Sequence, residues 1–190
     1  MEKLKLFALL SFFMIGTCVN AQTMLIDYGS TWAYYDNGNT PPDSNGLDWN
    51  DINFDASAWN TGTAQLGFGD GDESTTLNSS VNAAYFRYSF DVPDPDSFDE
   101  LDLELIFDDA AVVYLNGTEI WRVNFPPGPI TYSSFAAGQS QENELTTNTF
   151  NNNLIVTGDN VIAVEIHQHS ATSTDISFDL YAFGAVTAKR

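Results

Sequence analysis

Three groups of polar residues in this chain have the types and the spacing that chemistry needs. They are a glycine-rich acidic loop around Asp70, the adjacent pair Asp108 and Asp109, and the only two histidines, His167 and His169. No serine has a Gly-x-Ser-x-Gly setting, and no phosphate-binding glycine loop occurs. The sequence therefore predicts that any function depends on these three groups and that the chain is not an enzyme.

The acidic loop over residues 67–73 carries carboxylates at Asp70, Asp72 and Glu73. Glycine lets the backbone fold tightly enough for several oxygens to converge, and Ca²⁺ takes about six to eight oxygen ligands. We interpret these three residues as candidate ligands of a structural calcium, and expect no other cofactor. The alternative is a solvated acidic turn.

The adjacent carboxylates Asp108 and Asp109 open a strand-like run. The two catalytic carboxyl groups of a glycosidase flank a bond at roughly 5–10 Å, whereas adjacent residues on a strand point to opposite faces. This pair is thus unsuited to acid and base roles. One of them either binds a cation or braces a loop by accepting backbone N–H groups, and the second role is favoured.

His167 and His169 stand two apart on an extended run, so their side chains are expected on one face. They chelate a transition metal only if a further donor such as Asp175 or Glu165 approaches. Histidines held by hydrogen bonds are the favoured alternative.

An exposed tryptophan ring can stack on the apolar face of a sugar, although most rings in a sandwich belong to the core. Trp121 alternates with Ile120 and is expected to face outward. The candidate ligand-binding residues are Trp121, Asp109, His167, Gln168 and Asp175.

The elements that position these residues are strands. Asn116-Gly117 between two β-prone runs predicts a two-residue hairpin. Apolar residues alternate with polar ones over 86–92, 101–107 and 176–182, which predicts strands with one wet face each. The run 160–167 is apolar on both sides and is expected at the centre of a sheet. About eight to ten strands with negligible helix indicate an all-β fold: a two-sheet antiparallel β-sandwich of the jelly-roll kind.

The N-terminus has the pattern of a secretory signal peptide over residues 1–21, with a basic start, an apolar core and a small-x-small site ending at Ala21. We therefore expect a secreted protein whose residues 22–190 form a single domain. Lipid attachment at Cys18 is the less favoured alternative, since Thr17 precedes it. No later segment is long and apolar enough for membrane insertion.

The charge is strongly unbalanced, with 26 acidic residues against six lysines and arginines and a net charge of −20. Binding to phosphate backbones depends on clustered Lys and Arg, so a nucleic acid partner is excluded. Neutral glycans and divalent cations are compatible with this charge. Solubility alone is the simplest reason for it.

The chain resembles the galactose-binding-domain-like jelly-roll modules of secreted, multidomain bacterial proteins. The resemblance covers nearly all of residues 22–190. It is carried by 32–38, 54–59, 66–73, 85–87, 108–117, 160–168 and 175–180. The family's acidic loop matches residues 69–73, its Asp-Asp strand opening matches Asp108 and Asp109, and its His-Gln strand end matches His167 and Gln168. Ala110 stands where glycine is usual, and His169 where a small or hydroxyl residue is usual.

Such modules often sit beside metallophosphoesterase, glycoside hydrolase or cell-surface domains. The resemblance implies a non-catalytic extracellular binding module for carbohydrate or another cell-surface polymer, with neighbouring enzymes or surface proteins as partners. The alternatives are a structural or adhesion spacer without a small ligand, and an accessory domain of a secreted hydrolase such as a metallophosphoesterase. A small metal-dependent hydrolase is the third class, and it would need a site that the sequence does not display.

Overall fold

The computed structural model describes residues 22–140 and 145–186. The predicted signal peptide, with Cys18, lies outside the described residues. Within them there is no α-helix and no helix that could span a membrane. The strands are β1 (Gln22–Ile26), β2 (Thr31–Tyr35), β3 (Asn60–Thr63), β4 (Leu66–Phe68), β5 (Thr75–Thr76), β6 (Ala83–Val92), β7 (Glu100–Asp108), β8 (Ala110–Leu115), β9 (Thr118–Val123), β10 (Thr146–Asn151), β11 (Gly158–His167) and β12 (Ile176–Ala185), with a single 3₁₀ turn, η1 (Pro95–Ser97).

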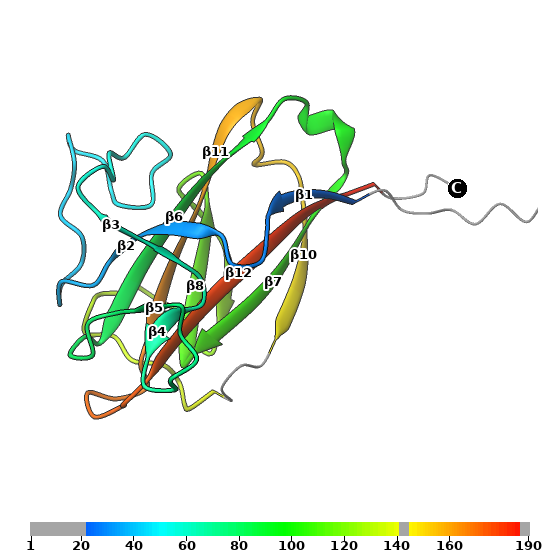
Figure 1. Ribbon diagram of the computed structural model, residues 1–190. Coiled ribbons are helices and arrows are strands. Elements are labelled where there is room, and N and C mark those ends of the chain that lie inside the picture. The colour runs from blue at the N-terminus through cyan, green and yellow to red at the C-terminus, as the bar shows by residue number, and fades with distance from the viewer. Residues whose placement is uncertain (1–21, 141–144, 187–190) are drawn as a thin grey trace, which may run out of the picture.

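The strands form two sheets that pack face to face, so the predicted β-sandwich is confirmed (Figure 1). Sheet A has the order β10-β7-β12-β4-β5, with β1 also paired to β12. Sheet B has the order β3-β2-β6-β11-β8-β9. The prediction that residues 160–167 lie at the centre of a sheet is confirmed, because β11 lies between β6 and β8. The described residues contain twelve strands, more than expected, since β3, β4 and β5 are short.

The main core fills the space between the sheets. In β7, Leu101, Leu103 and Leu105 point inward and are fully buried, while Asp102 and Glu104 between them are partly exposed. In β12, Phe178 and Leu180 enter the same core from the neighbouring strand. The period-two alternation of the sequence thus gives sheet A its inner and outer faces.

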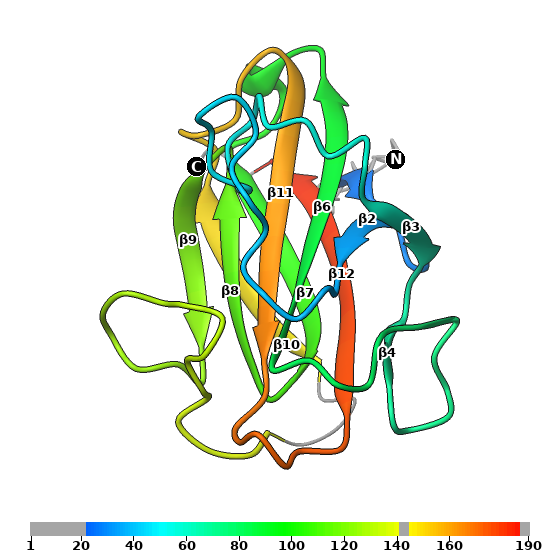
Figure 2. The same ribbon diagram turned by 90° about the vertical axis from the view of Figure 1, so that its left-hand side faces the viewer.

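A second apolar cluster covers the outer face of sheet B. Trp49 and Phe54, from the long segment between β2 and β3, pack on Tyr85, Val161 and other residues that point away from the main core. Figure 2 shows this segment crossing in front of β11 and β6. The wet face expected for residues 86–92 is therefore exposed at Ser89 and Asp91 of β6 but covered at Arg87, which is only 6% exposed.

The hairpin between β8 and β9 is confirmed. Asn116 and Gly117 have φ angles of 50° and 85°, the signs that a type I′ turn requires at both central positions. The Asn116 side chain also accepts a hydrogen bond from the backbone N–H of Val161, which ties the turn to β11.

We expect Gly117→Val to lower the free energy of unfolding by at least about 1 kcal/mol, because a β-branched residue is strained at positive φ. A Cβ at position 117 meets only ordinary contacts, the nearest at 3.6 Å from Asp51 Cα, so the effect comes from the backbone angle. Urea unfolding measures it. Gly138→Val is the matched control, since a Cβ there meets open space and Gly138 has no positive φ. Equal stability of both variants would contradict this reason.

Candidate functional site

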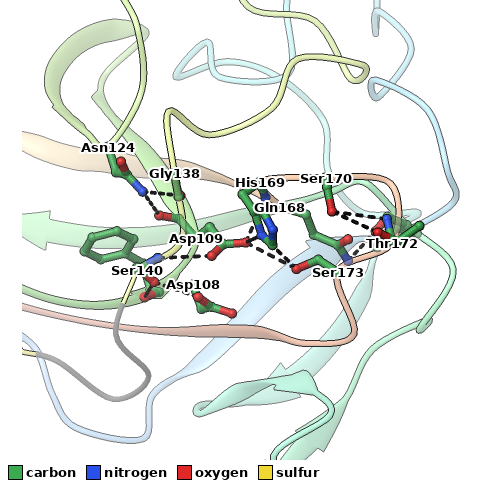
Figure 3. Close-up of polar contacts among 12 residues, drawn as sticks. Asp108, Asp109, Asn124, Gly138, Ser140, Gln168, His169, Ser170, Thr172 and Ser173 are labelled. Atoms are coloured by element: carbon green, nitrogen blue, oxygen red, sulfur yellow. Dashed lines mark hydrogen bonds and ion pairs between the residues drawn. The ribbon is translucent and has the colours of Figure 1, made fainter.

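The candidate residues gather at one end of the sandwich, where the chain passes from one sheet to the other. Asp109 lies between β7 of sheet A and β8 of sheet B, and residues 168–175 connect β11 to β12. Figure 3 shows Asp108 and Asp109 beside His169 and Ser173 of this second connection. Both connections are therefore held in place by the strands that they join, which are paired within the two sheets.

Asp109 is the centre of a hydrogen-bond network. Its Oδ2 accepts from the backbone N–H of His169 (2.8 Å), from His169 Nδ1 (2.9 Å) and from Ser173 Oγ (3.4 Å). Its Oδ1 accepts from the backbone N–H of Ser140 (3.1 Å). The Asp109 carboxylate therefore joins three segments that are far apart in the sequence.

The Asp109 carboxylate is 3% exposed. Burial alone would raise its pKa, but the hydrogen bonds from His169 and Ser140 outweigh burial, and the pKa is lowered. Asp109 thus stays ionised and braces the loop by accepting backbone N–H groups, as the sequence favoured.

Asp108 has a different role from its neighbour. Its Oδ1 accepts from Ser140 Oγ (2.6 Å), and its side chain shares a hydrogen bond with Asp109. Burial, together with the negative charge of Asp109, raises the pKa of Asp108 to about 7 against the effect of the Ser140 bond. Two carboxyl groups in hydrogen-bond contact are much closer together than the roughly 5–10 Å that separates the catalytic carboxyl groups of glycosidases.

His167 lies in a separate network on the outer face of sheet B. Its Nε2 is 3.1 Å from Glu165 Oε2, and its Nδ1 is 2.9 Å from the carbonyl oxygen of Ser134. Glu165 also accepts from the hydroxyl of Tyr114 at 2.6 Å. His167 is completely buried beneath Phe125, whose ring centre is 5.0 Å from that of the imidazole.

The two histidines therefore do not share a set of ligands. His169 Nδ1 contacts Asp109, whereas His167 contacts Glu165. Among the residues that the structure describes, the only group of three or more potential metal ligands is Asp70, Asp72 and Glu73. The favoured interpretation, histidines held by hydrogen bonds, matches the observed contacts.

Gln168 and Asp175 differ in how they are held. Gln168 is buried, and its Nε2 donates to the carbonyl oxygen of Val81 (2.9 Å). Asp175 is half-buried, and its negative charge raises the pKa of both Asp70 and Asp108. The charge of Asp175 therefore acts both on the acidic loop and on the carboxyl pair of Asp108 and Asp109.

Trp121 does not face outward, and that expectation is wrong. A bulge in the β8–β9 pairing places Trp121 opposite Val113, whose side chain belongs to the main core. Cross-strand partners share a face, so the Trp121 ring points between the sheets, 6.0 Å from the ring centre of Phe150. Its edge-strand position leaves it only partly buried.

The acidic loop is folded by its own side chains. Glu73 accepts from the backbone N–H groups of Asp70 and Gly71, both at 3.0 Å, and Ser177 Oγ donates to Asp70 at 2.8 Å. Gly69 is required, because a Cβ there would lie 2.5 Å from the Thr174 carbonyl oxygen and φ is 109°. The loop is therefore pressed against residues 174 and 175.

This loop brings one ligand oxygen each from Asp70, Asp72 and Glu73 within 4.8 Å of one another. Burial raises the pKa of Asp70 despite the Ser177 bond, and the charges of Asp175, Asp72 and Glu73 raise it further. Such a cluster can hold a hard cation, because a cation relieves the repulsion and supplies partners for the carboxylate oxygens.

Sequence reasoning missed three participants in these networks. Ser140 and Asn124 hold Asp109 from the connection that follows β9, and nothing in their local sequence indicates it. Asn124 has φ of 52°, a conformation that asparagine adopts more readily than most residues. Arg87 is the third: it is buried under the segment that covers sheet B, although it stands on the polar side of the 86–92 alternation.

The fold and these networks define an all-β domain of two sheets, in which Asp108, Asp109 and Gln168 are buried at the crossings and Arg87, Glu165 and His167 on the outer face of sheet B. No family model matches the chain, and no curated protein does. The comparison with solved structures does find matches, among them glycoside hydrolases.

Beta-glucuronidase 2 of Bacteroides uniformis matches with a TM-score of 0.55 and 14% identity, over 87% of this chain and 18% of that chain. An uncultured Clostridium sp. beta-glucuronidase matches with a TM-score of 0.54 and 14% identity, over 93% of this chain and 31% of that chain. At this identity the similarity shows a shared fold. The chain spans less than a third of the length of these enzymes.

Proposed function

We propose that this protein is a non-catalytic, exported accessory module of the galactose-binding-domain-like kind, which binds carbohydrate or another cell-surface polymer. One observation carries the proposal: almost the whole chain matches a part of glycoside hydrolase chains that has the length of one domain. Fold alone does not establish a ligand, so binding must be measured.

The polar end of the sandwich supports a non-catalytic role. Asp108 and Asp109 are in hydrogen-bond contact, and Asp109 is saturated by donors from the protein itself. His167 is completely buried. A general acid or base must reach the proton that it transfers, whereas the polar atoms of Asp109 and His167 are already bonded to other groups of the protein.

The same contacts favour a second candidate function, a structural or adhesion spacer without a small ligand. A network that only braces loops needs no ligand to satisfy it. The two functions differ in whether the isolated protein binds a defined glycan.

A glycan array with and without EDTA tests the proposal, with sugar release from the bound glycans measured in parallel. We expect binding to a restricted set of glycans and no release of sugar. Absence of binding in the presence of Ca²⁺ would favour the spacer, and release of sugar would contradict a non-catalytic role.

We further propose that Asp70, Asp72 and Glu73 hold a structural Ca²⁺. Binding that favours the folded state stabilises by about 2.7 kcal/mol at 100 times the dissociation constant. We therefore expect the melting temperature to rise in millimolar Ca²⁺ relative to EDTA, with a smaller rise in Mg²⁺. Asp72→Asn should reduce the calcium-specific rise, whereas Asp91→Asn, at an exposed site on β6, should leave it unchanged. Equal melting temperatures in Ca²⁺ and in EDTA would contradict the proposed calcium site.

A further inference from the structure

One buried cation has no carboxylate partner. The described residues contain two arginines, Arg87 and Arg122. Arg122 forms a two-pronged ion pair with Glu119, at 2.8 and 2.6 Å. Arg87, in a protein with 26 acidic residues, forms no ion pair within the part of the chain that the structure describes.

The Arg87 guanidinium is held by backbone carbonyl groups of the segment that covers sheet B. Its Nη1 donates to Trp49 and its Nη2 to Phe54, and its central carbon lies 5.3 Å from the Phe54 ring centre. These bonds use two of its five N–H groups. Its Nε forms no hydrogen bond to the described residues and is not a fully buried atom, so this edge of the guanidinium is open to solvent.

Burial lowers the pKa of Arg87 to about 10, although the negative charge of Asp51 acts in the opposite direction. A buried charge without a close partner is costly, and an anion beside it would offset that cost. Asp51 itself does not lie within ion-pair distance in the structure.

Arg87 also lines a groove of about 480 Å³ on the outer face of sheet B. Beside the cation, the groove presents the hydroxyl groups of Thr31, Ser57 and Ser89. Phe54 and Tyr88 also line it, but Phe54 is largely buried under Arg87 and the Tyr88 ring packs on the main core against Trp32. A cation ringed by hydroxyl groups fits a sugar that carries a negative charge, because the sugar hydroxyls bond to the rim. The groove is lined, among others, by Arg87, Phe54, Tyr88, Thr31, Ser57 and Ser89.

We propose that this groove binds a sugar that carries a carboxylate, with the carboxylate on the Arg87 guanidinium. This inference rests on the proposed carbohydrate-binding function and assigns it a ligand class and a place. A planar guanidinium matches a carboxylate with two parallel hydrogen bonds, and such a charge-assisted pair is stronger than a bond to a neutral hydroxyl.

The net charge of −20 sets a limit on the ligand. The repulsion between the acidic surface and an anionic ligand is screened beyond about 8 Å at physiological salt. An ion pair between a carboxylate and a partly buried guanidinium is screened much less. A single uronate unit, or an isolated one within a neutral glycan, therefore fits this groove better than a polymer with a charge on every sugar.

The test titrates D-glucuronate and D-glucose into the protein and follows the backbone amide signals by NMR. These sugars differ in the carboxylate, and we expect glucuronate to bind at least tenfold more tightly, with shifts at residues around Arg87 and Ser57. Equal affinity for the two sugars, or no binding of either, would overturn the inference.

Ser89 provides a matched pair of variants that leaves the Arg87 bonds intact. Ser89 is exposed, lies two residues from Arg87 on the same face of β6, and lines the same groove. Ser89→Glu supplies a competing carboxylate and should weaken glucuronate binding at least fivefold relative to Ser89→Gln. Equal binding by the two variants would exclude Arg87 as the anchor. Glycan-array binding that persists in Ser89→Glu and ignores carboxylates would leave the proposed function standing while this inference fails.

Discussion

Replacing Asp109 with alanine is expected to lower the free energy of unfolding by at least about 3 kcal/mol. The substitution removes an ionised group that accepts four hydrogen bonds from His169, Ser173 and Ser140, and it leaves the backbone N–H groups of His169 and Ser140 without their partner. Hydrogen bonds to charged groups contribute about 1.5–3 kcal/mol each, and a buried donor left unpaired costs about 1–3 kcal/mol. Urea unfolding followed by circular dichroism measures the loss.

Asp175→Ala is the matched control for Asp109→Ala. Asp175 belongs to the same end of the sandwich, and its negative charge acts on Asp70 and Asp108. Removing that charge should leave stability unchanged or raise it slightly. If Asp109→Ala melts like the native protein and loses glycan affinity instead, the carboxylate is a ligand contact and the bracing role is wrong.

Replacing Asp108 with asparagine is expected to stabilise the protein above pH 7, by about 2 kcal/mol after allowance for solvent screening. Asparagine keeps an oxygen that accepts from Ser140 and an N–H group that donates to Asp109, so it reproduces the protonated form of Asp108.

The sign of the pH dependence follows from the raised pKa. In the unfolded chain Asp108 ionises near pH 4, whereas in the folded protein its pKa is raised to about 7. Its contribution to stability is therefore complete below about pH 4 and is lost as the pH rises through 7. Asparagine does not titrate, so the advantage of Asp108→Asn should grow from about pH 4 to pH 7 and then stay constant.

Unfolding at pH 4.5 and at pH 8 measures this difference, with Asp91→Asn as the control for the removal of one negative charge from an acidic protein. Asp91 is exposed on β6 and far in sequence from the network. An equal shift for Asp108→Asn at both pH values, or a loss of stability at pH 8, would show that Asp108 is ionised in the folded protein.

Features that depend on local sequence were predictable. The Asn116-Gly117 turn follows from the need for positive φ at two adjacent positions, and the inner face of β7 follows from its leucines at every second residue. The central place of β11 follows from apolar residues on both of its faces. Each of these signals lies within about ten residues of chain.

Features set by distant contacts were not predictable. The alternation of residues 86–92 predicts that Arg87 is exposed on β6. Only the fold brings the Trp49 carbonyl, 38 residues away in the sequence, onto its guanidinium. Trp121 reads as outward, but the bulge in its pairing with β8 turns it inward. The strand β3 (Asn60–Thr63) is too short and polar to show an alternation, and β2 determines its place by pairing with it. The partners of Asp109 come from two separate connections, so its role was predictable while its contacts were not.

One measurement tests both parts of the proposed function, the binding of a glycan and the absence of its cleavage. NMR spectra of the protein mixed with the glycan that binds best on the array follow the protein amide signals and the anomeric signals of the sugar in the same sample overnight. We expect saturable, reversible shifts of protein signals and an unchanged sugar spectrum. Amide signals that never move would contradict binding, and the appearance of new reducing-end signals would contradict a non-catalytic role.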